Sequence, residues 1–273
     1  MEIKYITSRK NPLVSEIFSL RLKKNRDAER LFTAGGIKLF AEAAACRAGF
    51  FALLVRKSES EKILPIIGET GSEKGTFVLD DGVFDKISEE KSPEGLISVI
   101  KYLDTVRKSD TIEKDALASE VKNEGVIALE SVRDPGNVGT IIRSAAAFGF
   151  ETLLMSDDCA DVYSPRAVRA AMGALFSRRV ILTGDLPGAL CALRESGRRI
   201  YAAALAPGST PLQDTARDEG DIFVIGNEGH GLSAAVLAQA TAAVRIPMLE
   251  GPGVESLNAA VAASVIMYER KRC

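Results

Sequence analysis

Three glycine-containing segments in the second half of this 273-residue chain carry polar side chains in a pattern that favours ligand binding, and two of them also contain proline. In the first, Asp134-Pro135-Gly136 predicts a turn, and Asn137 is placed to cap the helix that follows. Arg143 lies about one and a half turns into that helix, and its side chain can lean back toward the helix start. An arginine beside free helix N–H groups suits a phosphate or a developing alkoxide. A capped helix with a solvated arginine is the alternative interpretation.

The second segment is a glycine-rich loop, 226–233, that directly follows the apolar run 222–225. Its glycines form the pattern GxxGxG, unlike the GxGxxG of dinucleotide sites, and they allow backbone to approach a ligand closely. Glu228 could bind or orient a polar group, and Ser233 is placed to cap the next helix. We interpret His230, between two glycines, as an exposed loop residue.

The third segment, 246–258, leads into a helix rich in small residues, 259–268. Its two prolines and two glycines predict a rigid, irregular loop. Ser256 and Asn258 place a hydroxyl and an amide at the start of the helix. Taken alone, this pattern also fits a well-capped C-terminal helix.

The composition excludes several kinds of site. The only histidine is His230, so multi-histidine metal sites are excluded and a Ser-His-Asp arrangement would depend on that residue alone. The four cysteines form no CxxC pair, which predicts reduced thiols. The sequence has no secretory signal and no apolar run of the roughly 18–20 residues that span a bilayer, so we expect a cytoplasmic protein without membrane contact. With a net charge of −2, an anionic partner would have to meet local basic patches.

The elements that position these loops are expected to form two α/β domains. We predict a small domain over 1–103, a charged interdomain linker over 104–123, and a second domain over 124–273. In the first domain, Asn11-Pro12 predicts the start of one helix that continues to Lys24. A second helix is expected over 37–45, with strands at 51–55, 76–79 and 96–100. Basic residues near the first helix form a candidate anion-binding patch, or equally a solvated helix face: Lys23, Lys24, Arg26 and Arg30.

In the second domain, short apolar runs alternate with segments of helical length. Continuous apolar strands separated by helices predict a mainly parallel sheet covered on both faces. The expected strands are 126–129, 152–155, 179–182, 200–205, 222–225 and 244–247. Ligands bind such sheets in loops at the carboxyl ends of the strands, which is where the three segments fall.

Together, the three segments resemble the SpoU (TrmH) family of RNA ribose 2′-O-methyltransferases, within the SPOUT superfamily. The resemblance rests on 137–143 (NVGTIIR), 225–229 (IGNEG), 246–248 (IPM) and 255–258 (ESLN), which keep the family's order and spacing. Segment 166–176 is also similar to the family's pattern, except that Ala171 stands where many members have serine.

The third loop and the N-terminal segments also bear on this resemblance. The third loop is longer between Met248 and Glu255 than in many members of the family. Residues 7–12 and 23–26 are similar to the family's substrate-binding domain, which has an L30e-like fold. The resemblance therefore extends, more loosely, to the first half of the chain.

The resemblance implies that the second domain is an α/β knot. In such a domain the C-terminal segment threads through a loop to form a trefoil, and S-adenosylmethionine binds there without a metal. Family members form homodimers through this domain and bury the C-terminal helix. The residues that the resemblance assigns to the cofactor are Leu205, Gly226, Ile246, Met248 and Leu257.

The implied reaction is attack of a ribose 2′-hydroxyl on the cofactor's methyl group, with ribosomal RNA as the favoured substrate. We expect Arg143 to hold a phosphate and stabilise the emerging alkoxide, because a guanidinium seldom gives up its proton. Asn137 is expected to orient Arg143 or the ribose. The resemblance assigns Glu228, Ser256 and Asn258 to the rest of the pocket, and it adds Arg169 to the RNA-binding residues.

Three alternatives stay open. The substrate could be transfer RNA, since the sequence does not identify the RNA. A non-catalytic RNA-binding protein on the same fold is a second alternative, although Asn137, Arg143, Glu228 and Asn258 are all intact. A nicotinamide-dependent oxidoreductase is a third, although the chain lacks the glycine fingerprint that such enzymes carry.

Overall fold

The computed structural model describes residues 3–89, 93–109, 114–122, 124–206, 208–216, 218–249 and 256–271. The chain divides into two compact units, one of residues 1–104 with 161–176, the other of residues 105–160 with 177–273. This division differs from the expected domain limits, because segment 161–176 packs with the first unit. Within the described ranges, no helix is both long and apolar enough to cross a membrane.

The first unit is built on a five-stranded sheet. Its described strands are β1 (Ile3–Ile6), β2 (Leu31–Gly35), β3 (Phe50–Arg56), β4 (Thr76–Leu79) and β5 (Leu96–Lys101). They lie in the order β1-β4-β3-β5-β2, with parallel pairs up to β3 and antiparallel pairs on either side of β5. The expected strands β3, β4 and β5 are confirmed. β1 was not expected, because it is an edge strand with two exposed residues and so has little apolar signal.

The helices on this sheet differ from expectation at one point. They are α1 (Pro12–Ser19), α2 (Lys23–Glu29), α3 (Ile37–Ala45), α4 (Ser60–Ile67) and α5 (Asp81–Ile87), with the short 3₁₀ helix η1 (Lys57–Glu59). Asn11 caps α1 as predicted, since its side chain accepts the N–H of Leu13 at 2.9 Å. The single helix expected from Asn11 to Lys24 is instead two helices, because Asn25 and Arg26 donate side-chain N–H groups to carbonyls at the end of α1.

A segment from the second half of the chain completes the first unit. It contains α8 (Pro165–Ala171) and the 3₁₀ helix η2 (Ala174–Phe176), and α8 packs on β2. The ring centroid of Phe32 on β2 lies 4.7 Å from that of Tyr163 and 6.3 Å from that of Phe176. Asp161 forms an ion pair with Arg26 of α2 at 2.6 Å. These aromatic and ionic contacts explain why the segment belongs to the first unit.

The second unit is built on a sheet in which every described strand pair is parallel. Its order is β11-β13-β10-β12-β7-β8-β9-β6. The strands are β6 (Val106–Ser109), β7 (Val126–Leu129), β8 (Thr152–Ser156), β9 (Arg179–Thr183), β10 (Ile200–Ala203), β11 (Thr210–Pro211), β12 (Ile222–Ile225) and β13 (Ala242–Arg245). The parallel sheet predicted from alternating apolar runs is confirmed. The trefoil knot stays a prediction, because residues 250–255 lie outside the described residues.

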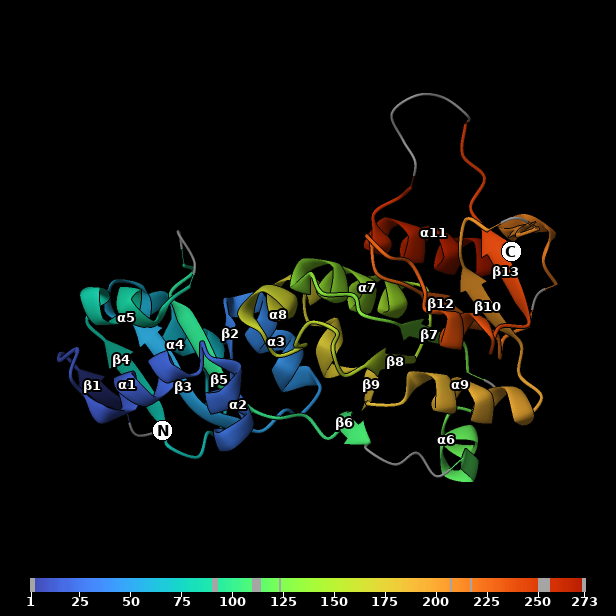
Figure 1. Ribbon diagram of the computed structural model, residues 1–273. Coiled ribbons are helices and arrows are strands. Elements are labelled where there is room, and N and C mark those ends of the chain that lie inside the picture. The colour runs from blue at the N-terminus through green and yellow to red at the C-terminus, as the bar shows by residue number, and fades with distance from the viewer. Residues whose placement is uncertain are drawn as a thin grey trace. The chain divides into compact units, whose positions relative to one another are not determined.

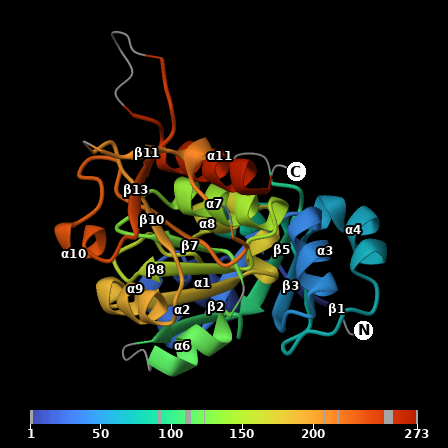
Figure 2. The same ribbon diagram turned by 90° about the vertical axis from the view of Figure 1, so that its right-hand side faces the viewer.

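Helices cover both faces of this second sheet, as Figures 1 and 2 show. On one face, α7 (Pro135–Ala147) packs against α11 (Ala259–Lys271). On the other face, α6 (Lys114–Glu120) packs against α9 (Leu186–Glu195), and α9 also contacts the short α10 (Ala234–Leu237). The core beneath α9 joins these helices to the central strands.

The segment expected to be a charged linker, 104–123, is partly built into this unit. β6 pairs with β9 at the edge of the sheet, and α6 packs on α9. Leu117 and Val121 are buried in the core at this contact. The segment predicted as a charged interdomain linker therefore contains a packed helix, because two well-spaced apolar residues are enough to seat a short helix.

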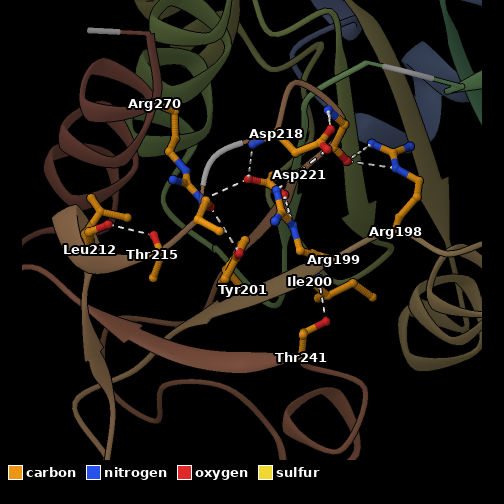
Figure 3. A network of polar contacts seen from close by, with 12 residues as sticks. Arg198, Arg199, Ile200, Tyr201, Leu212, Thr215, Asp218, Asp221, Thr241 and Arg270 are labelled. Atoms are coloured by element: carbon orange, nitrogen blue, oxygen red, sulfur yellow. Dashed lines mark hydrogen bonds and ion pairs between the residues drawn. The ribbon is translucent and has the colours of Figure 1, made fainter.

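The C-terminal end of α11 is fixed at the amino ends of the strands. Arg270 donates to the carboxylate of Asp221, which precedes β12, at 2.9 Å, and the two side chains are only 5% and 3% exposed. Arg199, which precedes β10, donates to the other carboxylate oxygen at 2.9 Å. Figure 3 shows Asp221 between these two arginines. The Arg270 guanidinium also lies over the ring of Phe223, 4.7 Å from its centroid.

Candidate cofactor and catalytic site

Three loops of the second unit meet at the carboxyl ends of the central strands. The side-chain amide of Asn137, on α7, donates to a carboxylate oxygen of Glu228 at 2.5 Å. Its carbonyl oxygen accepts from the side-chain amide of Asn258 at 3.1 Å. The structure thus joins one residue from each segment that the sequence singled out into a polar cluster, Asn137–Glu228–Asn258.

Asp134, and not Asn137, caps α7. The carboxylate of Asp134 accepts the backbone N–H of Asn137 at 2.9 Å, and Pro135 takes the first helical position. The prediction that Asn137 caps the helix is wrong, because the helix begins at Pro135. Since Asp134 satisfies its backbone N–H, Asn137 has its whole side chain available for Glu228 and Asn258.

Asn258 starts α11 and links it to α7. Its side-chain oxygen accepts the N–H groups of Ala260 and Val261 at 2.9 and 3.3 Å, while its amide donates to Asn137. Farther along, the hydroxyls of Ser144 on α7 and Ser264 on α11 lie 2.7 Å apart. The two helices are therefore joined by polar contacts at two levels.

A cavity of about 370 Å³ opens at the same edge of the sheet. All five residues expected to bind the cofactor line it: Leu205, Gly226, Ile246, Met248 and Leu257. Glu228 and Ser256 line it as well, together with Arg245. The volume falls within the range of small-molecule sites, about 300–1,000 Å³.

The glycine-rich loop beside the cavity is shaped by Asn227. Its side chain donates to the carbonyl of Ser131 at 2.9 Å and accepts the N–H groups of Gly229 and His230 at 2.8 and 3.2 Å. A Cβ at Gly226 would lie 2.5 Å from the backbone of Gly231, so this position requires glycine. Asn227 was not among the predicted site residues, although an asparagine two residues before a glycine is typical of an Asx turn.

Two smaller expectations for this loop are confirmed. Ser233 caps α10, since its hydroxyl accepts the N–H of Val236 at 3.2 Å. His230 is exposed, although it also contributes to the lining of the cavity.

Arg143 is exposed on α7. It makes no hydrogen bond or ion pair with the described residues, and it is not among those that line the cavity. Asn137 was expected to orient Arg143 or the ribose. Among the described residues its side chain bonds to Glu228 and Asn258 and not to Arg143, so a role toward the ribose stays a prediction. The guanidinium of Arg143 is therefore available to a substrate.

The structure separates the five expected RNA-binding residues into two groups. Lys23, Lys24, Arg30 and Arg169 are exposed on the first unit. Arg26 is only 4% exposed, and it donates to Asp161 and to the carbonyls that end α1. The expectation that Arg26 contacts RNA is wrong, because its guanidinium is fully engaged inside the unit.

Two further observations on the described residues concern possible metal ligands and the cysteine thiols. In this part of the chain, no group of three or more His, Cys, Asp or Glu side chains could hold a metal ion. Cys46, Cys159 and Cys191 are free thiols. Burial raises the pKa of the Cys159 thiol, so this side chain is neutral at physiological pH.

The fold and the site together define a two-unit α/β protein with a cavity of small-molecule size at the carboxyl ends of a parallel sheet. Residues 124–268 match the SpoU rRNA Methylase family, and residues 11–98 match the MRM3-like substrate binding domain. The chain belongs to the SpoU rRNA methylase family. It is therefore an enzyme that transfers methyl groups to RNA.

Individual relatives match the chain over nearly its whole length. It is 30% identical over 266 residues to the 23S rRNA (guanosine(2553)-2′-O)-methyltransferase RlmP of Bacillus subtilis. The match covers 97% of this chain and 98% of that protein. A solved rRNA methyltransferase from Sinorhizobium meliloti has a TM-score of 0.81 and 27% identity, with 99% and 98% of the two chains covered. An AdoMet-bound rRNA methyltransferase structure from the same organism also has a TM-score of 0.81, at 28% identity, with 98% and 97% covered.

Proposed function

We propose that this chain transfers a methyl group from S-adenosylmethionine to a ribose 2′-hydroxyl of ribosomal RNA. The observation that carries the proposal is the meeting of the cavity and the Asn137–Glu228–Asn258 cluster at one edge of the sheet. The Bacillus subtilis relative, a 23S rRNA 2′-O-methyltransferase that matches almost the whole chain, supports both ribosomal RNA and the 2′-hydroxyl.

The chemistry of the cavity fits S-adenosylmethionine. Leu205, Ile246 and Leu257 supply apolar surface for an adenine ring. The carboxylate of Glu228 matches the cofactor's positive charges, and the guanidinium of Arg245 matches its carboxylate. The AdoMet-bound structure from Sinorhizobium meliloti supports this assignment. When bound, the cofactor supplies the electrophilic methyl group.

Arg143 is the residue that we assign to the substrate's reacting end. A guanidinium seldom gives up its proton, so Arg143 does not act as the base. It binds a substrate phosphate and stabilises negative charge as it develops on the 2′-oxygen. The hydroxyl proton passes to the phosphate or to water. Asn137, Glu228, Asn258 and Ser256 orient the ribose and the cofactor.

The first unit binds the RNA. Its exposed cations, Lys23, Lys24, Arg30 and Arg169, suit the phosphate backbone. The match of residues 11–98 to a substrate binding domain supports this role. Arg26 takes no part, because it is buried.

We also propose a homodimer formed through the second unit. Val261, Val265 and Tyr268 follow one face of α11 and are 48%, 36% and 54% exposed. A second copy would cover this apolar stripe.

The free thiols support a cytoplasmic location, where cysteines stay reduced.

The test is methyl transfer from labelled S-adenosylmethionine to total RNA from a strain that lacks this protein. Wild type should label one ribosomal RNA at a ribose that then resists alkaline cleavage. Arg143→Ala should lower turnover by about 10²–10³-fold. Its affinity for S-adenosylmethionine should stay unchanged, because Arg143 does not line the cavity.

Three outcomes would contradict parts of this proposal. Label in transfer RNA alone would overturn the ribosomal substrate. Near-normal turnover by Arg143→Lys would overturn the bidentate role of the guanidinium. Absence of S-adenosylmethionine binding would overturn the assignment of the cavity. Arg194→Ala, which removes an exposed arginine of α9 that does not line the cavity, is the matched control.

A further inference from the structure

Ser131 has an unusual backbone conformation beside the candidate site. Its φ is +55°, in the left-handed region that residues other than glycine rarely adopt. Its N–H donates to the hydroxyl of Ser156 at 2.8 Å, its hydroxyl donates to Asp158 at 2.6 Å, and its carbonyl accepts from Asn227 at 2.9 Å. Ser131 therefore joins loops at the ends of β7, β8 and β12. Strained backbone conformations that are held in place by several hydrogen bonds are common at functional sites.

Asp158 is the common acceptor of this cluster. One carboxylate oxygen accepts the hydroxyl of Ser156 at 2.6 Å, and the other accepts the hydroxyl of Ser131 and an N–H of Arg133, the latter at 3.3 Å. Partial burial acts to raise the pKa of the Asp158 carboxyl, but the two hydroxyls and Arg133 together lower it. Asp158 is therefore a carboxylate at neutral pH.

Arg133 is held by Asp158 and still faces solvent. Its side chain is 72% exposed, and Asp158 is its only hydrogen-bond partner among the described residues. That contact uses one terminal nitrogen, so the other guanidinium donors are open. Arg133 directly precedes Asp134, the cap of α7, in the loop that leads to Asn137. Arg133 is thus a cation with available donors on the loop that leads to the candidate site.

We propose that Arg133 is a further substrate-binding residue that contacts an RNA phosphate near the target ribose, and that Asp158 is the positioning residue that holds Arg133 in place. Ser131 and Ser156 fix the carboxylate of Asp158, so they act through it. A guanidinium anchored at one nitrogen still presents paired N–H groups that match the oxygens of a phosphate. This inference rests on the proposed RNA substrate.

The experiment measures how binding of full-length protein to 23S ribosomal RNA transcribed in vitro depends on salt. The variants are Arg133→Ala, Arg133→Lys and Asp158→Asn, with Arg194→Ala as the control for loss of an exposed arginine elsewhere in the second unit. Each phosphate contact contributes about 0.7–0.9 to the slope of log affinity against log salt concentration. Melting temperatures establish that every variant is folded.

Arg133→Ala should weaken RNA binding about tenfold at low salt and reduce the slope by about one contact. Arg133→Lys should keep the wild-type slope, because it keeps the charge. Asp158→Asn should keep the slope but weaken binding several-fold, because the cation remains and loses its orientation. S-adenosylmethionine affinity should be unchanged in all variants, since neither residue lines the cavity.

Unchanged affinity and slope in Arg133→Ala would overturn the inference and leave the proposed function intact. Tighter RNA binding by Asp158→Asn would overturn the positioning role, because it would mean that Asp158 competes with phosphate. Failure of the wild type to methylate any RNA that it binds would contradict the proposed function alone, and the salt slopes would still decide the role of Arg133. Absence of RNA binding by the wild type would contradict both.

Discussion

At the scale of single residues, the position at which α7 begins determines which partners the side chain of Asn137 can bind. Asp134 bonds to the backbone N–H of Asn137, which leaves both polar atoms of the amide for other partners. An amide is well matched to the cluster, because it donates to the carboxylate of Glu228 and accepts from Asn258. Asp134 therefore caps the helix, and the side chain of Asn137 joins the polar cluster.

This separation predicts different effects of two alanine substitutions. Asp134→Ala should lower the free energy of unfolding by about 1 kcal/mol through loss of the cap. Asn137→Ala should keep the cap but leave Glu228 and Asn258 without their partner, so methyl transfer should fall by at least about tenfold. Urea unfolding and initial rates of methyl transfer separate the two effects. Equal losses of stability and activity in both variants would contradict this assignment.

Asp158 gives a prediction in pH. Although partial burial opposes it, hydrogen bonds and Arg133 lower the carboxyl pKa in the folded protein, so the ionised form stabilises the fold. That stabilisation is complete above the pKa of the unfolded chain, about 3.9, and is lost as the pH falls through the lower folded value. The nearby Cys159 thiol stays neutral over this range, because burial raises its pKa.

The melting temperature of wild type should therefore exceed that of Asp158→Asn by a constant amount from about pH 7 to pH 5. The difference should shrink as the pH falls below about 4. Thermal melting at each pH measures it. A difference that is the same at pH 3 and pH 7 would show that the carboxylate charge is not the cause.

At the scale of elements, α11 connects the two ends of the second sheet. Its first turn begins at Asn258, beside the cavity, and its last turn carries Arg270, which pairs with Asp221 at the amino ends of the strands. Between these ends, Ala259, Ala262 and Ile266 line the cavity. The position of one wall of the cavity therefore depends on contacts made at the far end of the helix.

Arg270→Leu should lower the free energy of unfolding by about 3 kcal/mol, because it leaves a buried carboxylate with one partner fewer. Arg270→Lys should lose less, since it keeps the positive charge. Urea unfolding measures both, and Arg194→Leu on the exposed part of α9 is the control. A loss under about 1 kcal/mol for Arg270→Leu would mean that the pair contributes little to holding α11.

At the scale of the whole molecule, the chain passes between its two units three times, after residues 104, 160 and 176. The excursion 161–176 supplies α8 and the rings that pack on Phe32. It also supplies Asp161, the ion-pair partner of Arg26. The first unit is therefore complete only when residues from the second half of the chain are present.

A fragment of residues 1–103 should fold poorly by itself. It would expose Phe32 and leave the guanidinium of Arg26 without its carboxylate, at a cost of several kcal/mol. Circular dichroism should show reduced helix content, and a synthetic peptide of residues 161–176 should restore part of it. A fragment that melts cooperatively at the temperature of the intact protein would contradict this view of the first unit.

Features that depend on short stretches of chain could be predicted from the sequence. Apolar runs such as 126–129 and 222–225 identified the parallel strands, because a buried strand is apolar along its whole length. Ser233 was identified as a cap from its position before a helix. The five residues that the resemblance predicts to bind the cofactor all line one cavity, because their loops follow strands of a single sheet.

Features that depend on partners distant in the chain became evident only in the folded protein. Nothing near Arg26 in the sequence indicates burial, because its carboxylate, Asp161, lies in the other half of the chain. The sequence likewise does not indicate that Leu117, in the segment predicted as a linker, is buried in the core. Nor does it indicate that Ser131 bonds to Asp158 and Asn227. Periodicity and capping report local geometry, whereas the choice of partner for a charge or an apolar side chain follows from which strands become neighbours.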